Sequence, residues 1–358
     1  MKKITLVLTL LALTLAGCGL IPSGVSASQN LEITDSTGHN AVLDGLPQRI
    51  AIAGKATFMV QDSIFLFQEA SQRVVALENR KQSVFSFLPV VDPTISDKEI
   101  FEANVGPEQI AAAQPDLVLL KSYMAESLGD PLEQLNIPVV YLDLETPQAF
   151  YEDIQTLGQV FGNTDRAEEI VNFYQDRVNL VQELISSSDL KPSVLILEYS
   201  EDGGEVAFSV PPVSWLQTSM VETAGGSPIW KELDVSGGWT VVNLEQIAAW
   251  DPDQIYIIDY SGNASQVVED LKGNSIWSSL QAVQNDQLFA FPYDFYSWDQ
   301  PDTRWILGQE WLATKIHPDQ TADIDIMAEI QDFYQEMYFL DPEAIGSQVL
   351  PVLSGDIP

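Results

Sequence analysis

The chain has 358 residues, with 16 Lys and Arg against 52 Asp and Glu, so its formal net charge is −36. Nucleic-acid binders neutralise phosphates with basic side chains, and this balance excludes that class. Hydrophobic residues make up 46% of the chain, which predicts a substantial core, and the length predicts about two domains.

The amino terminus reads MKKITLVLTLLALTLAGCGL, in which two lysines precede an apolar run. This order is typical of a secretory signal, and the run is shorter than the about 20 apolar residues that span a membrane. Leu15-Ala16-Gly17-Cys18 resembles the lipobox of bacterial lipoproteins, whose cysteine is lipidated. We predict a signal peptide over 1–17, a lipid anchor at Cys18 and a flexible tether over 18–30. The alternative is an ordinary signal with a cysteine near its cleavage site.

Short β-rich apolar runs alternate with helical patterns along the rest of the chain. This alternation predicts an α/β fold with mostly parallel sheets and helices on both faces. The expected strands are 49–53, 73–77, 116–120, 138–142, 193–198, 254–258 and 287–291.

An internal repeat indicates two related lobes. Val105–Tyr123 and Val242–Tyr260 align without gaps and share nine identical positions of nineteen. Each copy reads as a short helix with the sequence EQIAA, a Pro-Asp turn and an apolar strand. Such repeats are the signature of duplicated structural units.

A long helical pattern separates the two halves. Asn163 or Thr164 can cap its start, its first turn is acidic, and Ser186–Ser188 end it. The pattern is about 22 residues long, or roughly 33 Å. We predict an N-terminal lobe over 31–162, an interdomain helix within 163–188 and a C-terminal lobe over 189–358.

Four motifs in order resemble the periplasmic binding proteins for ferric siderophores, haem and cobalamin. They are residues 31–54, with a short hairpin before Pro-x-Arg-Ile, the two repeat copies, and one carboxyl-terminal motif made of 275–292 followed by 304–319. The resemblance implies a substrate-binding protein of an ABC importer, with a ligand cleft between lobes joined by one helix. It also implies small lobe closure and two partners, a small-molecule metal complex and an ABC permease with its ATPase.

The same family docks on its permease through one glutamate per lobe. By position, these residues are Glu108 and Glu245, the paired acids of the internal repeat. The alternative is that both are ordinary helix-start carboxylates stabilised by the helix dipole.

Ligands of parallel α/β lobes bind beyond the carboxyl ends of the strands. Scarce cations and several aromatic residues fall there, and they predict an anionic, partly planar ligand. Each of these residues has an alternative interpretation, as a solvated loop cation or as an aromatic core residue. The ligand-site candidates are Lys55, Arg80, Lys81, Lys121, Arg304, Tyr123, Trp239, Tyr260, Tyr293, Tyr296 and Trp298.

Direct metal binding and catalysis are not expected. The two histidines, His39 and His317, are predicted at the surface, and the only cysteine is the anchor. No nucleophile elbow, phosphate-binding loop or dinucleotide motif occurs. A carbohydrate-active enzyme and an adhesion lipoprotein remain as alternative classes.

The predicted function is therefore capture of an iron complex, a ferric siderophore or carboxylate, by a lipid-anchored receptor. Cobalamin or haem, and molybdate or tungstate, are the alternatives on the same scaffold. We expect no cofactor, a monomer, and a location on the outer side of the cytoplasmic membrane.

Overall fold

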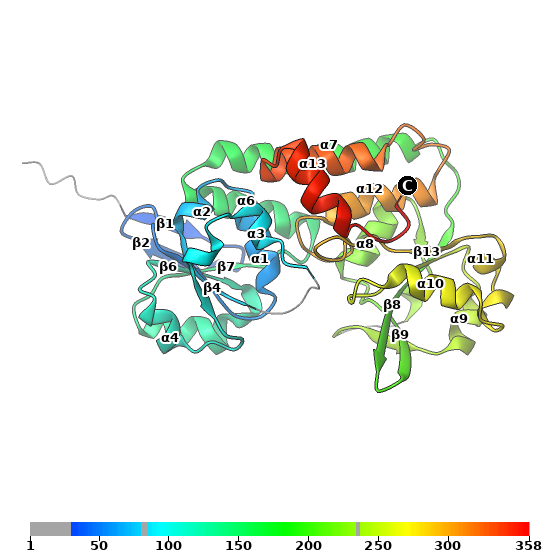
Figure 1. Cartoon of the computed structure of the whole chain (residues 1–358), viewed down its shortest axis with the longest axis horizontal. Helices are drawn as coiled ribbons and strands as arrows, with labels where there is room; N and C mark the ends of the chain where they lie inside the picture. The colour runs from blue at the N-terminus through cyan, green and yellow to red at the C-terminus, as the bar shows by residue number, and fades with distance from the viewer. Residues whose placement is uncertain (1–29, 80–84, 234–236, 358) are drawn as a thin grey trace, which may run out of the picture.

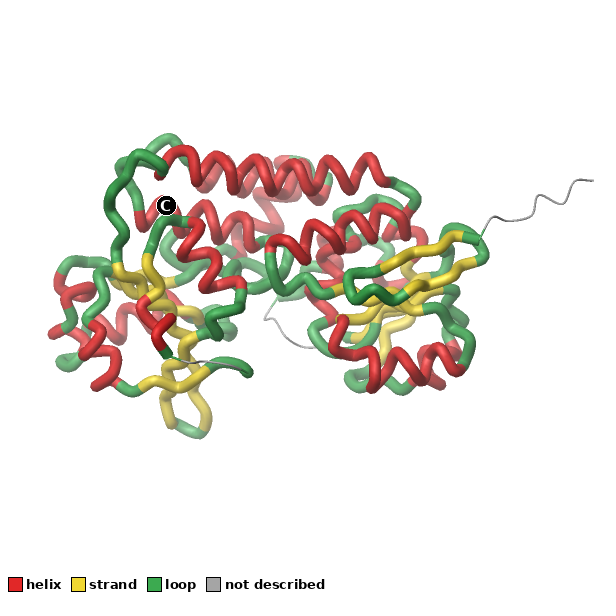
Figure 2. Tube along the Cα trace, turned by 180° about the vertical axis from the view of Figure 1, so that it is seen from behind, coloured by secondary structure: helices red, strands yellow, loops and turns green. Residues whose placement is uncertain are grey.

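The computed structural model describes residues 30–79, 85–233 and 237–357. Two α/β lobes lie side by side, and a helical layer runs across both of them (Figure 1). Seen from behind, the strands form separate groups below these helices (Figure 2). The two lobes and the helix expected between them are therefore present.

The N-terminal lobe begins with an antiparallel hairpin and continues as a five-stranded parallel sheet. Its strand order is β5-β4-β3-β6-β7. The strands are β1 (Leu31–Thr34), β2 (Asn40–Leu43), β3 (Ile50–Ile52), β4 (Val74–Glu78), β5 (Glu99–Phe101), β6 (Leu117–Lys121) and β7 (Val139–Leu142). The helices are α1 (Thr57–Ile64), α2 (Ala70–Arg73), α3 (Leu88–Val91), α4 (Pro107–Ala112), α5 (Asp130–Gln134) and α6 (Pro147–Phe161).

The C-terminal lobe contains a six-stranded mixed sheet. In the path β11-β9-β8-β12-β13, β9 runs antiparallel to both of its neighbours, β11 and β8, and β10 pairs in parallel with the start of β8. The strands are β8 (Ser193–Asp202), β9 (Glu205–Val210), β10 (Ser227–Pro228), β11 (Thr240–Val242), β12 (Gln254–Ile258) and β13 (Leu288–Ala290). The helices are α8 (Leu216–Thr223), α9 (Leu244–Trp250), α10 (Ala264–Lys272), α11 (Gln281–Gln284), α12 (Trp305–Ile316), α13 (Ile326–Tyr338) and α14 (Pro342–Ala344).

Helix α7 (Thr164–Ile185) is the 22-residue helix between the lobes. The Asn163 side chain caps its start by accepting a hydrogen bond from the backbone N–H of Arg166 at 3.1 Å. Its apolar stripe is buried, and the Tyr174 hydroxyl donates to the carbonyl of Thr303 at 2.6 Å. This bond fixes the helix to the loop that precedes α12.

The two repeat copies fold alike. Helix α4 and strand β6 form the first copy, and helix α9 and strand β12 form the second. Both strands are completely buried, because each lies between two parallel neighbours in the interior of its sheet.

Candidate functional site

A cavity of about 210 Å³ lies between the lobes. It opens at the carboxyl ends of the first lobe's strands, because its lining residues follow β3, β6 and β7. The N-terminal lobe contributes Ala56, Met59, Tyr123 and Glu145, and the C-terminal lobe contributes Trp215, Leu216, Gln217, Trp239, Gln300 and Pro301. This is the place where parallel α/β lobes bind ligands.

Aromatic rings form a continuous wall behind the C-terminal side of the cavity. Trp215 and Trp239 meet edge to face with centroids 5.9 Å apart, and Trp239 meets Tyr260 in the same way at 6.3 Å. The rings of Tyr260 and Tyr296 stack at 6.0 Å. Because rings have few rotamers and large apolar faces, this wall suits an organic ligand.

The buried carboxylate of Asp299 positions the polar groups of this wall. Its Oδ2 accepts hydrogen bonds from Gln217 Nε2 at 2.9 Å, from Gln300 Nε2 at 3.0 Å and from the Tyr260 hydroxyl at 3.0 Å. Its Oδ1 accepts from the Ser297 hydroxyl at 2.5 Å. A carboxylate only accepts, so it fixes the direction of both amides.

The described lining carries one charged side chain, Glu145. The ammonium of Lys121 pairs with Glu145 at 2.6 Å and also donates to the carbonyl of Asp143. Lys121 is fully buried, so it is neutralised behind the wall rather than presented to a ligand. The prediction of positive charge at this position is corrected accordingly.

The other predicted cations are dispersed. Lys55 is exposed and precedes the lining residue Ala56, but it is not itself part of the described lining. Arg80 and Lys81 lie outside the described residues. Arg304 is fully buried and bonded to three carboxylates, so it belongs to the packing between the lobes and not to the cavity wall.

The predicted aromatic residues fall into two groups. Tyr123 and Trp239 line the cavity, and Tyr260 lies directly behind Trp239. Tyr293 and Trp298 are buried in the lobe, where Trp298 Nε1 donates to Asp294 at 3.0 Å. Tyr296 is also buried, and its ring contacts Phe58 of the other lobe at 4.1 Å. The interrupted sequence of this segment reflects buried hydrogen bonds instead of exposure.

Sequence reasoning missed most of the remaining lining. Trp215, Gln217 and Gln300 lie in segments without a repeat, and neutral amides give no charge signal. Glu145 was not predicted, because one glutamate gives no distinct signal in a chain with 52 Asp and Glu residues. The one available signal was position, since Glu145 closely follows the predicted strand 138–142.

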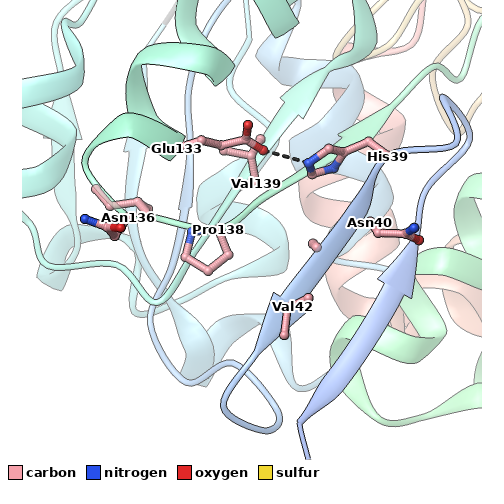
Figure 3. A pocket seen from close by; sticks show the side chains of 9 residues that line it. His39, Asn40, Val42, Glu133, Asn136, Pro138 and Val139 are labelled. Carbon is pink, nitrogen blue, oxygen red and sulfur yellow. Dashed lines mark ion pairs between the residues drawn. The ribbon is translucent and has the colours of Figure 1, made fainter.

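His39 lies in a different pocket, on the hairpin side of the N-terminal lobe (Figure 3). Its Nε2 is 2.7 Å from a carboxylate oxygen of Glu133. His317 is buried at the end of α12, with Nε2 3.4 Å from the carbonyl of Gly225, so its predicted surface position was wrong. The described part of the chain contains no group of three His, Cys, Asp or Glu side chains arranged to hold a metal ion.

Glu108 and Glu245 are exposed in the first turns of α4 and α9. These helices lie in different lobes, both on the side away from α7 (Figure 1). Cys18 and residues 1–17 lie outside the described residues. Within the described ranges, no helix is both long and apolar enough to cross a membrane.

Residues 68–294 match the family described as periplasmic binding protein. The chain belongs to the periplasmic binding protein family. The iron-uptake system-binding protein of Bacillus subtilis is 23% identical over 309 residues, which cover 82% of this chain and 92% of that protein. The molybdate-binding protein MolA of Haemophilus influenzae is 23% identical over 257 residues, covering 66% of this chain and 70% of MolA. A periplasmic solute-binding protein from Veillonella parvula has the same fold, with a TM-score of 0.73, 23% identity and coverage of 90% of this chain and 98% of that one.

Proposed function

We propose that this periplasmic binding protein captures an iron complex, a ferric siderophore or carboxylate, and delivers it to the permease of an ABC importer. The observation that carries the proposal is the aromatic cavity lined by both lobes. It provides an apolar wall and a few fixed polar groups, which is how binding sites hold organic ligands. The name of the iron-uptake relative supports the ligand class.

The size and charge of the cavity limit the ligand. About 210 Å³ is below the usual range of about 300–1,000 Å³ for ligand pockets, so a siderophore would insert one part and leave the rest at the entrance. Glu145 is paired with the buried Lys121, so the described lining offers no net positive charge to an anion. A chelate that presents a neutral portion therefore fits better than a compact polyanion.

A compact oxyanion such as molybdate is the second candidate. The small volume favours it, and MolA is a relative that binds molybdate by name. Cobalamin and haem also exceed the described volume and, like a siderophore, would insert only one part, for which the aromatic wall suits planar ligands.

Thermal-shift and calorimetric titrations against ferric siderophores, ferric citrate, haem, cobalamin and molybdate test the ligand. A ferric complex should raise the melting temperature, because binding to the native state stabilises it by mass action. Trp239→Ala should weaken the affinity for the ferric complex about tenfold or more. Phe339→Ala removes an exposed ring that does not line the cavity, so it should leave this affinity unchanged. Stabilisation by molybdate alone would reject the iron proposal.

We further propose that Glu108 and Glu245 dock the two lobes on basic residues of the permease. Their support is equivalent placement, in the first turns of repeated helices on one side of the molecule. Glu108→Lys with Glu245→Lys should abolish transport and leave ligand affinity unchanged. Normal transport by this variant would contradict docking.

The anchor is proposed at Cys18, after removal of residues 1–17. Cys18→Ser should release the protein from the membrane fraction. Cell fractionation measures this release, and incorporation of a labelled lipid measures acylation of the cysteine. We propose no catalytic activity, no cofactor and a monomeric receptor facing the outside of the cytoplasmic membrane.

A further inference from the structure

The ammonium of Lys121 lies directly behind two residues that line the interlobe cavity. Its Nζ is 2.6 Å from a carboxylate oxygen of Glu145 and 6.0 Å from the centre of the Tyr123 ring. Both Glu145 and Tyr123 line the cavity, whereas Lys121 has no exposed surface. The Glu145 side chain is 40% exposed, so the cavity meets the acidic partner of this ion pair and not the basic one.

The loop that carries Glu145 is fixed by hydrogen bonds. The buried carboxylate of Asp153 in α6 accepts from the backbone N–H groups of Asp143, at 2.7 Å, and Leu144, at 2.8 Å. The Asp143 carboxylate accepts a further bond from the Ser122 hydroxyl at 2.9 Å. Leu144 has a φ of 61°, which is uncommon for a residue with a side chain, so these bonds hold the chain in a conformation that it rarely adopts. The backbone therefore sets the position of Glu145 before any ligand binds.

This arrangement treats ligands of different charge differently. A buried ammonium needs a negative partner, because an unpaired charge away from water is costly. An anionic ligand would have to displace the Glu145 carboxylate from Lys121, and it would be repelled by that carboxylate as it approached. A neutral ligand leaves the ion pair intact and meets neither cost.

We propose that Glu145 is a specificity-determining residue, which excludes anions from the cavity and selects an uncharged ferric chelate. A ferric trihydroxamate is such a chelate, because its hydroxamate anions cancel the charge of the ferric ion. Ferric citrate and molybdate carry a net negative charge. The inference rests on the proposed function and narrows its ligand to the neutral class.

Calorimetric titration of the receptor with a neutral ferric trihydroxamate, ferric citrate and molybdate tests this selection. The wild type should bind the trihydroxamate most tightly. Glu145→Gln removes the negative charge and leaves Lys121 to pair with the ligand, so the affinity for both anions should rise about tenfold or more. The affinity for the trihydroxamate should not change.

Lys121→Met tests the ion pair from its other side, and it keeps the inference testable if Glu145→Gln does not fold. Methionine fills the space of the lysine stem, and the partly exposed Glu145 stays hydrated. The affinity for a cationic ferric trihydroxamate, which carries a free ammonium, should rise about tenfold relative to the neutral one. The double variant, Lys121→Met with Glu145→Gln, has neither charge and should bind anions as weakly as the wild type.

Glu126→Gln is the matched control, since Glu126 is exposed in the same lobe and does not line the cavity. Its affinity for each probe should equal that of the wild type. Wild-type affinity for the anions in folded Glu145→Gln, or an unchanged charge preference in Lys121→Met, would overturn the inference.

Two further outcomes separate this inference from the proposed function. If the wild type bound ferric citrate more tightly than the neutral trihydroxamate, the role of Glu145 would be overturned and iron capture would stand. If no ferric complex bound but Glu145→Gln gained affinity for molybdate, iron capture would be rejected and the role of Glu145 would stand.

Discussion

Glu310 is a buried acid without a hydrogen-bond partner. It lies in α12 with no exposed surface, and neither carboxylate oxygen is bonded. The Nε of Arg177 of α7 is 3.8 Å from a Glu310 carboxylate oxygen, and Arg177 also pairs with Glu329. Burial raises the pKa of Glu310 to about 8, and the charge of Glu329 adds to the increase. At neutral pH, Glu310 is therefore protonated in the folded protein and ionised in the unfolded chain.

This proton makes stability depend on pH in a defined direction. Below the ordinary glutamate pKa, Glu310 is protonated in both states and has no effect. As the pH rises toward 8, only the unfolded state ionises, so stability falls by up to about 1.4 kcal/mol per pH unit. We expect Glu310→Gln to remove this loss and to be more stable than the wild type at pH 8 by roughly 2–4 kcal/mol.

Urea unfolding at pH 5 and pH 8 measures the effect. The free energy of unfolding of the variant is compared with that of the wild type at the same pH, because the other acids contribute equally to both proteins. Glu183→Gln, at an exposed position of α7, serves as the control and should show no pH-dependent difference. An equal difference for Glu310→Gln at the two pH values would contradict the assignment.

At the scale of elements, α6 and α7 cross at a glycine. A methyl group at Gly158 of α6 would lie 2.6 Å from the Cβ of Ala167 in α7, closer than packed carbons approach. Gly158→Ala should therefore destabilise the protein by about 1–3 kcal/mol, because the helix between the lobes would have to shift. Chemical denaturation checks this value.

Gly346→Ala is the control for that substitution. Nothing lies within 4 Å of a methyl group built at Gly346, so this change should be neutral or slightly stabilising. Equal stability of the two alanine variants would show that α6 and α7 have room to separate.

The elements that sequence predicted are those with a strong local signal. The predicted strand 254–258 has the same bounds as β12, because a strand buried on both faces has a continuous apolar sequence. The long helical pattern corresponds to α7, because a regular apolar stripe is visible in the sequence. Strands β9 and β11 were missed, because the first half of β9 is exposed in a hairpin and β11 is only three residues long at the edge of its sheet. The site was harder to predict, because Trp215, Gln217 and Gln300 come together only through the tertiary fold.

At the scale of the whole molecule, Arg304 joins the lobes. Its Nη1 is 2.6 Å from Asp62 of α1 and 2.8 Å from Asp302, its Nε is 2.8 Å from Asp294, and its guanidinium lies 4.3 Å from the ring of Phe87. Helix α13 crosses the same boundary, where the Tyr338 hydroxyl donates to the carbonyl of Asp62 at 3.0 Å. Because the same helix α1 contributes Met59 to the cavity, the interlobe contact and the ligand site share one element.

In this contact, one guanidinium is bonded to three carboxylates. Loss of the arginine and loss of one of the acids should therefore affect stability differently. Burial raises the pKa of Asp62 well above its ordinary value, against the opposing charge of Arg304. Arg304→Ala would leave all three acids without their cation, and we expect a loss of about 3–5 kcal/mol in the free energy of unfolding. Asp62→Asn should cost much less, because Arg304 keeps two acids and one excess charge is removed.

Urea unfolding compares these two variants, and small-angle scattering follows the separation of the lobes. Arg304→Ala should increase the radius of gyration, since the contact between α1 and the second lobe is lost, whereas Asp62→Asn should retain the wild-type value. If both variants lost the same free energy of unfolding, the excess of carboxylates over the single guanidinium would not affect stability. If Arg304→Ala kept the wild-type radius, the remaining contacts of α7 and α13 would suffice to hold the lobes together.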